Sequence, residues 1–118
     1  IARSKVHGFA GRYDNIGLIK GKRSVQDFKS GWYNIKAGYQ LAGYRAALIE
    51  MGEETEDLGM VCVHLHRDGV KKGVYIYQHY DSCYLAFLSA LNLWRMVNFN
   101  TLKKMKWKWL LHEPIKIK

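Results

Sequence analysis

The chain has 118 residues, 48% of them hydrophobic, and a formal net charge of +9. This length and composition predict one folded domain with a packed core and exclude a disordered chain. Two cysteines are too few for a disulfide framework or a four-cysteine metal site, and no apolar run approaches the ~20 residues of a membrane-spanning helix.

The positive charge favours an anionic partner, most often nucleic acid, although a basic balance can also serve solubility alone. The two thiols and the lack of a recognisable signal peptide predict an intracellular protein that is not secreted: in a cytoplasm, a phage-infected host cell or an organelle matrix. No membrane partner is expected.

The first predicted elements form a β-hairpin. Residues 7–19 and 23–29 have strand-forming sequences, and the KGK between them supplies a glycine turn. If Lys20 and Gly21 are the two turn residues, Asp14 lies directly opposite Asp27 in the middle of the two strands. A slip of one residue in the turn would break this alignment. Because Asp is disfavoured in strands and rarely buried alone, the pair needs a partner that holds it there.

The rest of the chain continues with a helix, two strands and a second helix. Residues 33–52 predict the first helix, with Asn34 as candidate cap and Gly52 as its stop, and the acidic residues 53–57 form a loop. Residues 58–80 predict two strands around a turn, and residues 81–99 a helix with Asp81 as N-cap. The order β-β-α-β-β-α predicts a single domain (1–118) of the α/β (α+β) class, with a mixed central β-sheet flanked by helices.

The paired aspartates indicate a divalent cation. Two carboxylates this close repel each other unless a proton or a cation lies between them, and Mg²⁺ or Mn²⁺ suits such oxygen ligands. Lys29 follows Asp27 by two residues and therefore shares its face of the sheet. These residues and their basic surroundings suit phosphodiester hydrolysis. The alternative is an Asp–Lys–Asp salt-bridge cluster on a solvated face.

A further polar pair lies in the first predicted helix. Gln40 and Tyr44 are four residues apart and share one helix face, with Lys36 one turn earlier. The order of the motifs carries more information than each motif alone: G-x-x-D, then D-x-K after a hairpin, then Q-x-x-x-Y in the next helix.

The segments GRYD (11–14), DFKSG (27–31) and QLAGY (40–44) together resemble the core of the PD-(D/E)XK nuclease superfamily, particularly its RecB-like and phage or mitochondrial exonuclease members. The resemblance covers roughly residues 8–49. It implies a restriction-endonuclease-like core and a Mg²⁺- or Mn²⁺-dependent deoxyribonuclease, more specifically an exonuclease, that acts through a metal-activated water. A role in DNA repair or recombination would follow.

The resemblance also implies residue roles. Asp14 and Asp27 would bind the metal together with the backbone carbonyl of Phe28. Lys29 would position or activate the attacking water, and Gln40 and Tyr44 would line the site.

Members of the superfamily usually carry a helix with a further acid before the first strand, whereas only IARSKV precedes it here. That departure keeps a second reading open, a catalytically inactive DNA-binding domain on the same scaffold. In a third reading the chain is an ordinary basic interaction domain whose motifs are coincidental.

DNA is the expected partner, bound with weak sequence specificity through its phosphates. Residues 101–118 form a basic arm in which Lys alternates with Met and Trp over 103–109, as in a strand with one cationic face. Such an arm suits stacking on nucleic acid, and the alternative is an edge strand docked on the domain. The candidate DNA-binding residues are Arg12, Lys36, Lys103, Lys104, Lys106, Trp107 and Lys108.

Overall fold

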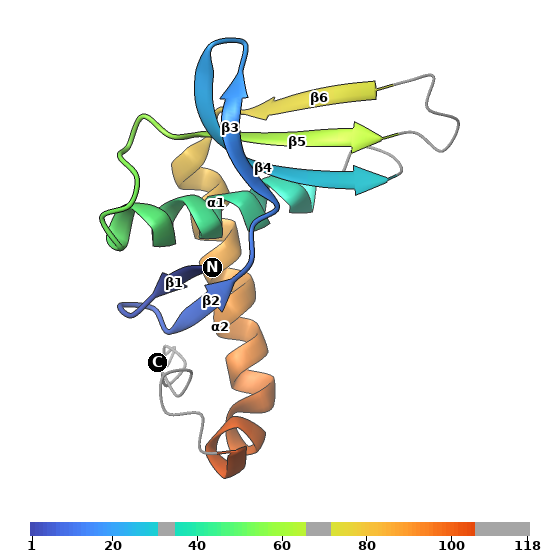
Figure 1. Cartoon of the computed structure of the whole chain (residues 1–118). Helices are drawn as coiled ribbons and strands as arrows, with labels where there is room; N and C mark the ends of the chain where they lie inside the picture. Colours follow the sequence, from blue (N-terminus) through green and yellow to red (C-terminus); the bar gives the residue numbers. More distant parts are fainter. Residues whose placement is uncertain (31–34, 66–71, 106–118) are drawn as a thin grey trace.

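The computed structural model describes residues 1–30, 35–65 and 72–105, apart from the side chains of Lys72 and of residues 99–105. A four-stranded mixed sheet has the order β3-β4-β5-β6, where β3 is Asn15–Ile19, β4 Lys22–Ser30, β5 Gly59–Leu65 and β6 Lys72–Tyr77. The two helices are α1 (Ile35–Glu50) and α2 (Tyr80–Met105). This architecture confirms the mixed α/β class, and Figure 1 shows the strands above α1.

The hairpin register is the one that the sequence predicted. Asn15 pairs with Gln26 and Ile19 with Lys22, which leaves Lys20 and Gly21 as a two-residue turn. Both turn residues have positive φ, 51° and 77°, as a type I′ turn requires. Such a turn matches the twist of the flanking strands and fixes which residues face each other.

The first predicted strand is interrupted. Residues 7–19 divide into β2 (Phe9–Gly11) and β3, with a break over residues 12–14, so Asp14 lies in a bend just before β3 and not in mid-strand. β2 pairs antiparallel with β1 (Ala2–Ser4) in a small separate hairpin. Arg95 of α2 donates to the carbonyl oxygens of His7 and Gly8, which ties this hairpin to α2.

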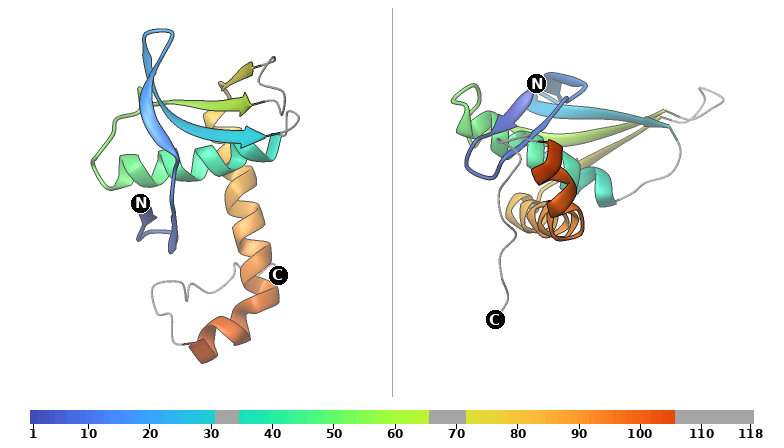
Figure 2. Two further views of the ribbon diagram at one scale, coloured as in Figure 1. Left: turned by 45° about the vertical axis from the view of Figure 1, so that its right-hand side comes forward. Right: turned by 90° about the horizontal axis from the view of Figure 1, so that it is seen from below.

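Both helices lie on one side of the sheet, as successive layers (Figure 2, right). Glycines let them pack closely: a Cβ on Gly38 would lie 2.6 Å from the Tyr77 ring, and one on Gly43 2.9 Å from the Phe87 ring. The core between the sheet and α1 includes Leu41. No described helix covers the other face of the sheet.

The end of α1 agrees with the sequence prediction, whereas the start of α2 does not. Gly52, with φ of 75°, stops α1: its N–H donates to Ile49 O at 3.0 Å, and Glu53 N–H donates to Leu48 O at 3.1 Å. This Schellman arrangement confirms the predicted stop. In α2 the first helical bond runs from Cys83 N–H to His79 O, so Asp81 lies inside the first turn and its assignment as N-cap was wrong.

The predicted basic arm overlaps the second helix. Residues 101–105 continue α2, so the strand interpretation was wrong for 103–105, because the helix extends a full turn beyond its predicted end at residue 99. Lys106, Trp107 and Lys108 lie outside the described residues, as does Asn34. Within the described ranges, no helix combines the length and apolarity that crossing a bilayer requires.

Candidate metal centre

The two aspartates meet where β3 and β4 part. Asp27 is in β4 and is buried, whereas Asp14 is exposed in the bend before β3, and their side chains hydrogen-bond to each other. The strand register ends at the pair Asn15 and Gln26, so the predicted mid-strand pairing of Asp14 with Asp27 is not formed, but the two side chains still meet just beyond that last pair. The two carboxyl groups therefore form one acidic unit.

The carboxyl groups differ in their affinity for a proton. The pKa of Asp14 is lowered, first by the hydrogen bond that Phe28 N–H donates to Asp14 Oδ2 at 2.8 Å and then by the hydrogen bond with Asp27. The pKa of Asp27 is raised, first by burial and then by its hydrogen bond with Asp14. A pair with this split holds a proton on Asp27 more readily than on Asp14.

The backbone N–H of Phe28 points toward Asp14. A residue in a strand directs its N–H and its carbonyl toward the same neighbouring strand. Since Phe28 N–H binds Asp14, the Phe28 carbonyl also lies on the edge that β3 leaves open. The exposed Phe28 side chain lies on the opposite face of the sheet from Asp27, because neighbouring residues in a strand alternate.

Lys29 joins the aspartates to α1. Its Nζ lies 3.0 Å from Asp27 Oδ2 and 3.4 Å from Gln40 Oε1. Gln40 Nε2 in turn donates to Tyr44 Oη at 2.6 Å. The ion pair with Asp27 is the main cause of the raised pKa of Lys29, which keeps this ammonium group charged. The structure thus brings together Asp14, Asp27, Lys29, Gln40 and Tyr44, which we call the carboxylate cluster.

A glycine missed by the sequence analysis helps to position the cluster. A Cβ on Gly11 would lie 2.5 Å from Tyr44 Cε1, so the Tyr44 ring packs directly against the backbone at the end of β2. Three residues later the chain reaches Asp14. The G in G-x-x-D was quoted as part of a motif, but nothing in the sequence indicated that it contacts Tyr44.

Two further residues border the cluster because β5 runs parallel to β4. Cys62 pairs with Asp27 and His64 with Lys29, and Cys62 Sγ lies 3.4 Å from His64 Nε2. Burial, and then the charge of Asp27, raise the pKa of Cys62 to about 11. Cys62 is therefore a protonated thiol in the wall of the site.

The cluster suits a hard divalent cation in two respects. Asp27 Oδ2 is buried and accepts no hydrogen bond of normal geometry, although the Lys29 ammonium is nearby. A cation beside Asp14 and Asp27 would relieve the repulsion between two charged carboxylates. Mg²⁺ needs only one or two carboxylates beside waters and phosphate oxygens. Among the described residues, however, no three His, Cys, Asp or Glu side chains gather as a metal site.

The candidate DNA-binding residues are only partly described. Arg12 is exposed in the break between β2 and β3, two residues before Asp14, and Lys36 is exposed in the first turn of α1. Lys103 and Lys104 belong to the last turn of α2, but their side chains are not described.

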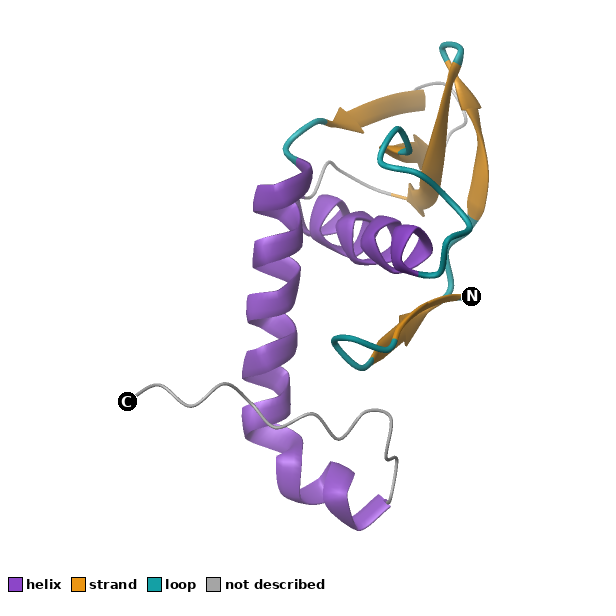
Figure 3. Ribbon diagram, turned by 90° about the vertical axis from the view of Figure 1, so that its left-hand side faces the viewer, coloured by secondary structure: helices purple, strands orange, loops and turns teal. Residues whose placement is uncertain are grey.

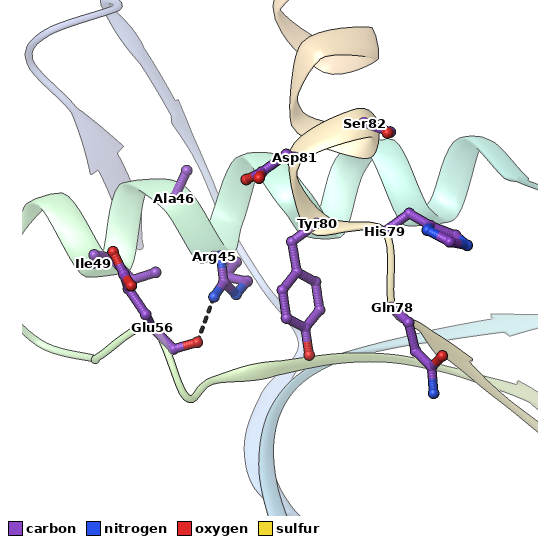
Figure 4. A pocket seen from close by; sticks show the side chains of 9 residues that line it. All are labelled: Arg45, Ala46, Ile49, Glu56, Gln78, His79, Tyr80, Asp81 and Ser82. Carbon is purple, nitrogen blue, oxygen red and sulfur yellow. Dashed lines mark hydrogen bonds between the residues drawn. The ribbon is translucent and has the colours of Figure 1, made fainter.

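A pocket of about 750 Å³ lies away from the cluster, at the start of α2 (Figure 4). Arg45 stacks on the Tyr80 ring at 4.1 Å and donates to the carbonyl oxygens of Leu58 and Glu56 at 2.7 Å and 2.5 Å. The guanidinium group is thus committed to holding the loop before β5, so this pocket does not compete with the cluster as the candidate site.

Comparison with known proteins adds no relative: no protein-family model, no curated protein and no solved structure matches the chain. The resemblance to the PD-(D/E)XK superfamily is thus carried by the sequence motifs alone.

Proposed function

We propose that the protein is a metal-dependent DNA nuclease that hydrolyses phosphodiester bonds at the carboxylate cluster, most simply as an exonuclease of the PD-(D/E)XK type. The observation that carries this proposal is the buried Asp27, which shares a hydrogen bond with Asp14 and an ion pair with Lys29. A buried carboxyl group with a raised pKa beside a second carboxyl group is uncommon, and such groups cluster at functional sites.

Asp14, Asp27 and the Phe28 carbonyl would hold Mg²⁺ or Mn²⁺. When bound, this ion supplies Lewis-acid stabilisation of a phosphate and a source of nucleophilic hydroxide at neutral pH. Asp27 is placed by the sheet and Asp14 by the Phe28 N–H, so both oxygens are oriented before any ligand arrives. Such preorganisation is the main contribution that an active site makes to electrostatic stabilisation.

Lys29 would offset the negative charge that develops on the phosphoryl oxygens. Its ammonium group stays protonated at neutral pH because of Asp27, and Gln40 restrains its position. Tyr44 restrains Gln40 in the same way. The net charge of +9 would draw the DNA backbone to the site with little sequence preference.

A second candidate function is a catalytically inactive DNA-binding domain on the same scaffold. The observation in its favour is that the described residues offer only two carboxylates to a metal. In that case the Asp27–Lys29 ion pair would be structural.

Digestion of a labelled linear DNA in Mg²⁺, Mn²⁺ or EDTA tests the proposal, with wild type, Asp27→Ala, Lys29→Ala and the control Asp57→Ala, which removes an exposed acid of the loop before β5. The proposal predicts cleavage that needs metal, is lost in the first two variants and persists in the control. Salt-sensitive DNA binding without cleavage would favour the inactive domain. Thermal unfolding of each variant shows whether it is folded.

A further inference from the structure

A network of polar side chains lies on the β3–β4 hairpin. Asn15 Nδ2 donates to Gln26 Oε1 at 3.0 Å, and Gln26 Nε2 lies 3.5 Å from Ser24 Oγ. The network is on the face of the sheet away from α1, because neighbouring residues in a strand alternate and Asp27 faces α1. Figure 3 shows this hairpin at the margin of the fold, with its turn at the top and α1 below it.

The amide pair of Asn15 and Gln26 is an unusual choice for this place. Gln26 is only 4% exposed, although no described helix covers this face of the sheet, and Asn is depleted from strands. A buried amide group must be hydrogen-bonded, whereas a pair of apolar side chains would carry no such requirement. The composition therefore indicates a use for the bond between these two side chains.

The hairpin also leaves space for the two amide groups. A Cβ on Gly17 would lie 3.3 Å from Asn15 Nδ2 and 3.4 Å from Gln26 Nε2, so a larger residue at Gly17 would press on both. Glycine weakens the interior of a strand and often marks a close approach of another group. Gly17 therefore favours the amide pair at some cost to β3 itself.

The amide pair lies at the last point where β3 is held to β4. Asn15 and Gln26 are the final pair of the register, and the chain leaves the sheet at the next residue, Asp14. The Asp14 carboxyl group then accepts from Phe28 N–H at 2.8 Å and hydrogen-bonds to Asp27. Without the amide pair, the end of β3 would fray more easily, and the Asp14 carboxyl group would move with it.

We propose that Asn15 and Gln26 are positioning residues, whose amide pair fixes the end of β3 so that the Asp14 carboxyl group stays beside Asp27. They act through the backbone from the opposite face of the sheet, so they are not catalytic residues. The inference rests on the proposed function, because the geometry that the pair maintains is that of the metal centre. Supporting groups around metal ligands typically change metal affinity by about 10–100-fold.

Calorimetric titration of Mn²⁺ into wild type, Gln26→Met, Asn15→Ala and the control Ser24→Ala tests the proposal. Gln26→Met keeps the length of the side chain and leaves the amide of the exposed Asn15 free to bind water, so the variant should fold. Ser24→Ala alters the same network two residues further from Asp14 and keeps the amide pair.

Both variants of the amide pair should raise the dissociation constant for Mn²⁺ about tenfold, whereas Ser24→Ala should bind like wild type. Thermal unfolding of each variant shows whether it is folded. If wild type binds Mn²⁺ and the variants of the amide pair bind it equally well, the inference is overturned while the proposed function stands. An equal loss of affinity in Ser24→Ala also overturns it, because any weakening of the hairpin would then suffice.

Hydrogen exchange at the Phe28 amide gives a readout that needs no metal. This N–H donates to Asp14 Oδ2, so its exchange rate reports whether the carboxyl group keeps its place. Exchange should become severalfold faster in Gln26→Met and Asn15→Ala and stay unchanged in Ser24→Ala. That pattern without any Mn²⁺ binding by wild type would support the positioning of Asp14 and reject the proposed function. Unchanged exchange in the variants of the amide pair overturns the positioning role.

Discussion

Two regions of the molecule reverse the usual distribution of side chains. The carboxylate cluster places a carboxyl group, Asp27, where only 5% of it is exposed, whereas the middle of α2 leaves the apolar side chains of Leu93 and Val97 64% and 76% exposed. Folded proteins normally bury apolar groups and expose charged ones. Both placements are unfavourable for the isolated chain, and the carboxyl pair becomes favourable once a cation lies beside it.

The largest expected effect concerns Asp27. Asp27→Asn keeps the shape of the side chain and removes its charge, so metal-dependent cleavage should fall on the order of a hundredfold or more. Without metal and at neutral pH, the free energy of unfolding of the variant should be about 1 kcal/mol larger than that of wild type, because the raised pKa of Asp27 means that its charged form is disfavoured in the folded state and Asn removes that cost. Denaturant unfolding without Mg²⁺ measures the free energy of unfolding of the metal-free protein, and the same experiment with Mg²⁺ measures how much the metal adds to it. A variant that is less stable than wild type and still gains stability from Mg²⁺ would contradict this comparison.

Gly43→Val should disturb the contact between α1, which carries Gln40 and Tyr44 of the cluster, and α2. The new side chain would begin 2.9 Å from the Phe87 ring, so α1 and α2 could not keep their present contact. Overpacking of this kind costs about 1–3 kcal/mol, seen as a lower denaturant midpoint. The matched control is Ala46→Val on the same helix, at a partly exposed position. A similar loss in both variants would mean that the general cost of a β-branched residue in a helix dominates.

Arg95→Met tests the polar anchor of α2. The buried guanidinium group has a lowered pKa because of its desolvation, and no described carboxylate pairs with it. Its removal would leave the His7 and Gly8 carbonyl oxygens without this donor, at a cost of about 1–3 kcal/mol. Hydrogen exchange should then become faster in β1 and β2 than in the central strand β5. Uniformly faster exchange would argue against a local anchor.

The pH dependence of stability should distinguish wild type from Asp27→Asn. A raised carboxyl pKa in the folded state contributes stability that is fully present below the ordinary Asp range and is lost as pH rises through the folded pKa. The stability advantage of Asp27→Asn should therefore grow as pH rises from about 3 to about 7. Asp14, whose pKa is lowered, contributes in the opposite sense and is present in both proteins. Parallel pH curves for the two proteins would mean that Asp27 is not perturbed.

The smallest expected effect comes from Tyr44→Phe. The change removes one hydrogen bond, the 2.6 Å contact with Gln40, and keeps the ring packed on Gly11. Such a loss is worth about 0.5–1.5 kcal/mol. Cleavage should fall only severalfold, because Tyr44 acts on Lys29 through Gln40. A loss as large as that of Asp27→Asn would assign Tyr44 a direct role.

The β3–β4 hairpin and most of the carboxylate cluster could be predicted from the sequence because local rules determine them. A two-residue turn at Lys20 and Gly21 specifies the register, a period of two places Lys29 on the face of Asp27, and a spacing of four joins Gln40 to Tyr44. Each of these relations involves residues close in the chain, so no knowledge of distant contacts was needed.

The parts that were not predicted depend on contacts between distant segments. The interruption at residues 12–14 separates β2 from β3. It accompanies two long-range contacts: the Tyr44 ring packs on Gly11, and Arg95 donates to the β1–β2 hairpin. The parallel pairing that brings Cys62 beside Asp27 joins strands separated by a helix and a loop. The exposed apolar side chains of α2, such as Leu93 and Val97, were not predicted because an apolar helix predicts burial, and only the fold shows which of its side chains stay exposed.

The central claim is that Asp14 and Asp27 are held together in order to bind a divalent cation. Calorimetric titration of Mn²⁺ into wild type and Asp27→Asn at neutral pH tests it most directly, because it does not depend on a choice of substrate. We predict saturable binding to wild type and no binding to the variant under the same conditions. Equal binding to both proteins, or none to wild type, would contradict the claim and leave the cluster as a structural ion pair.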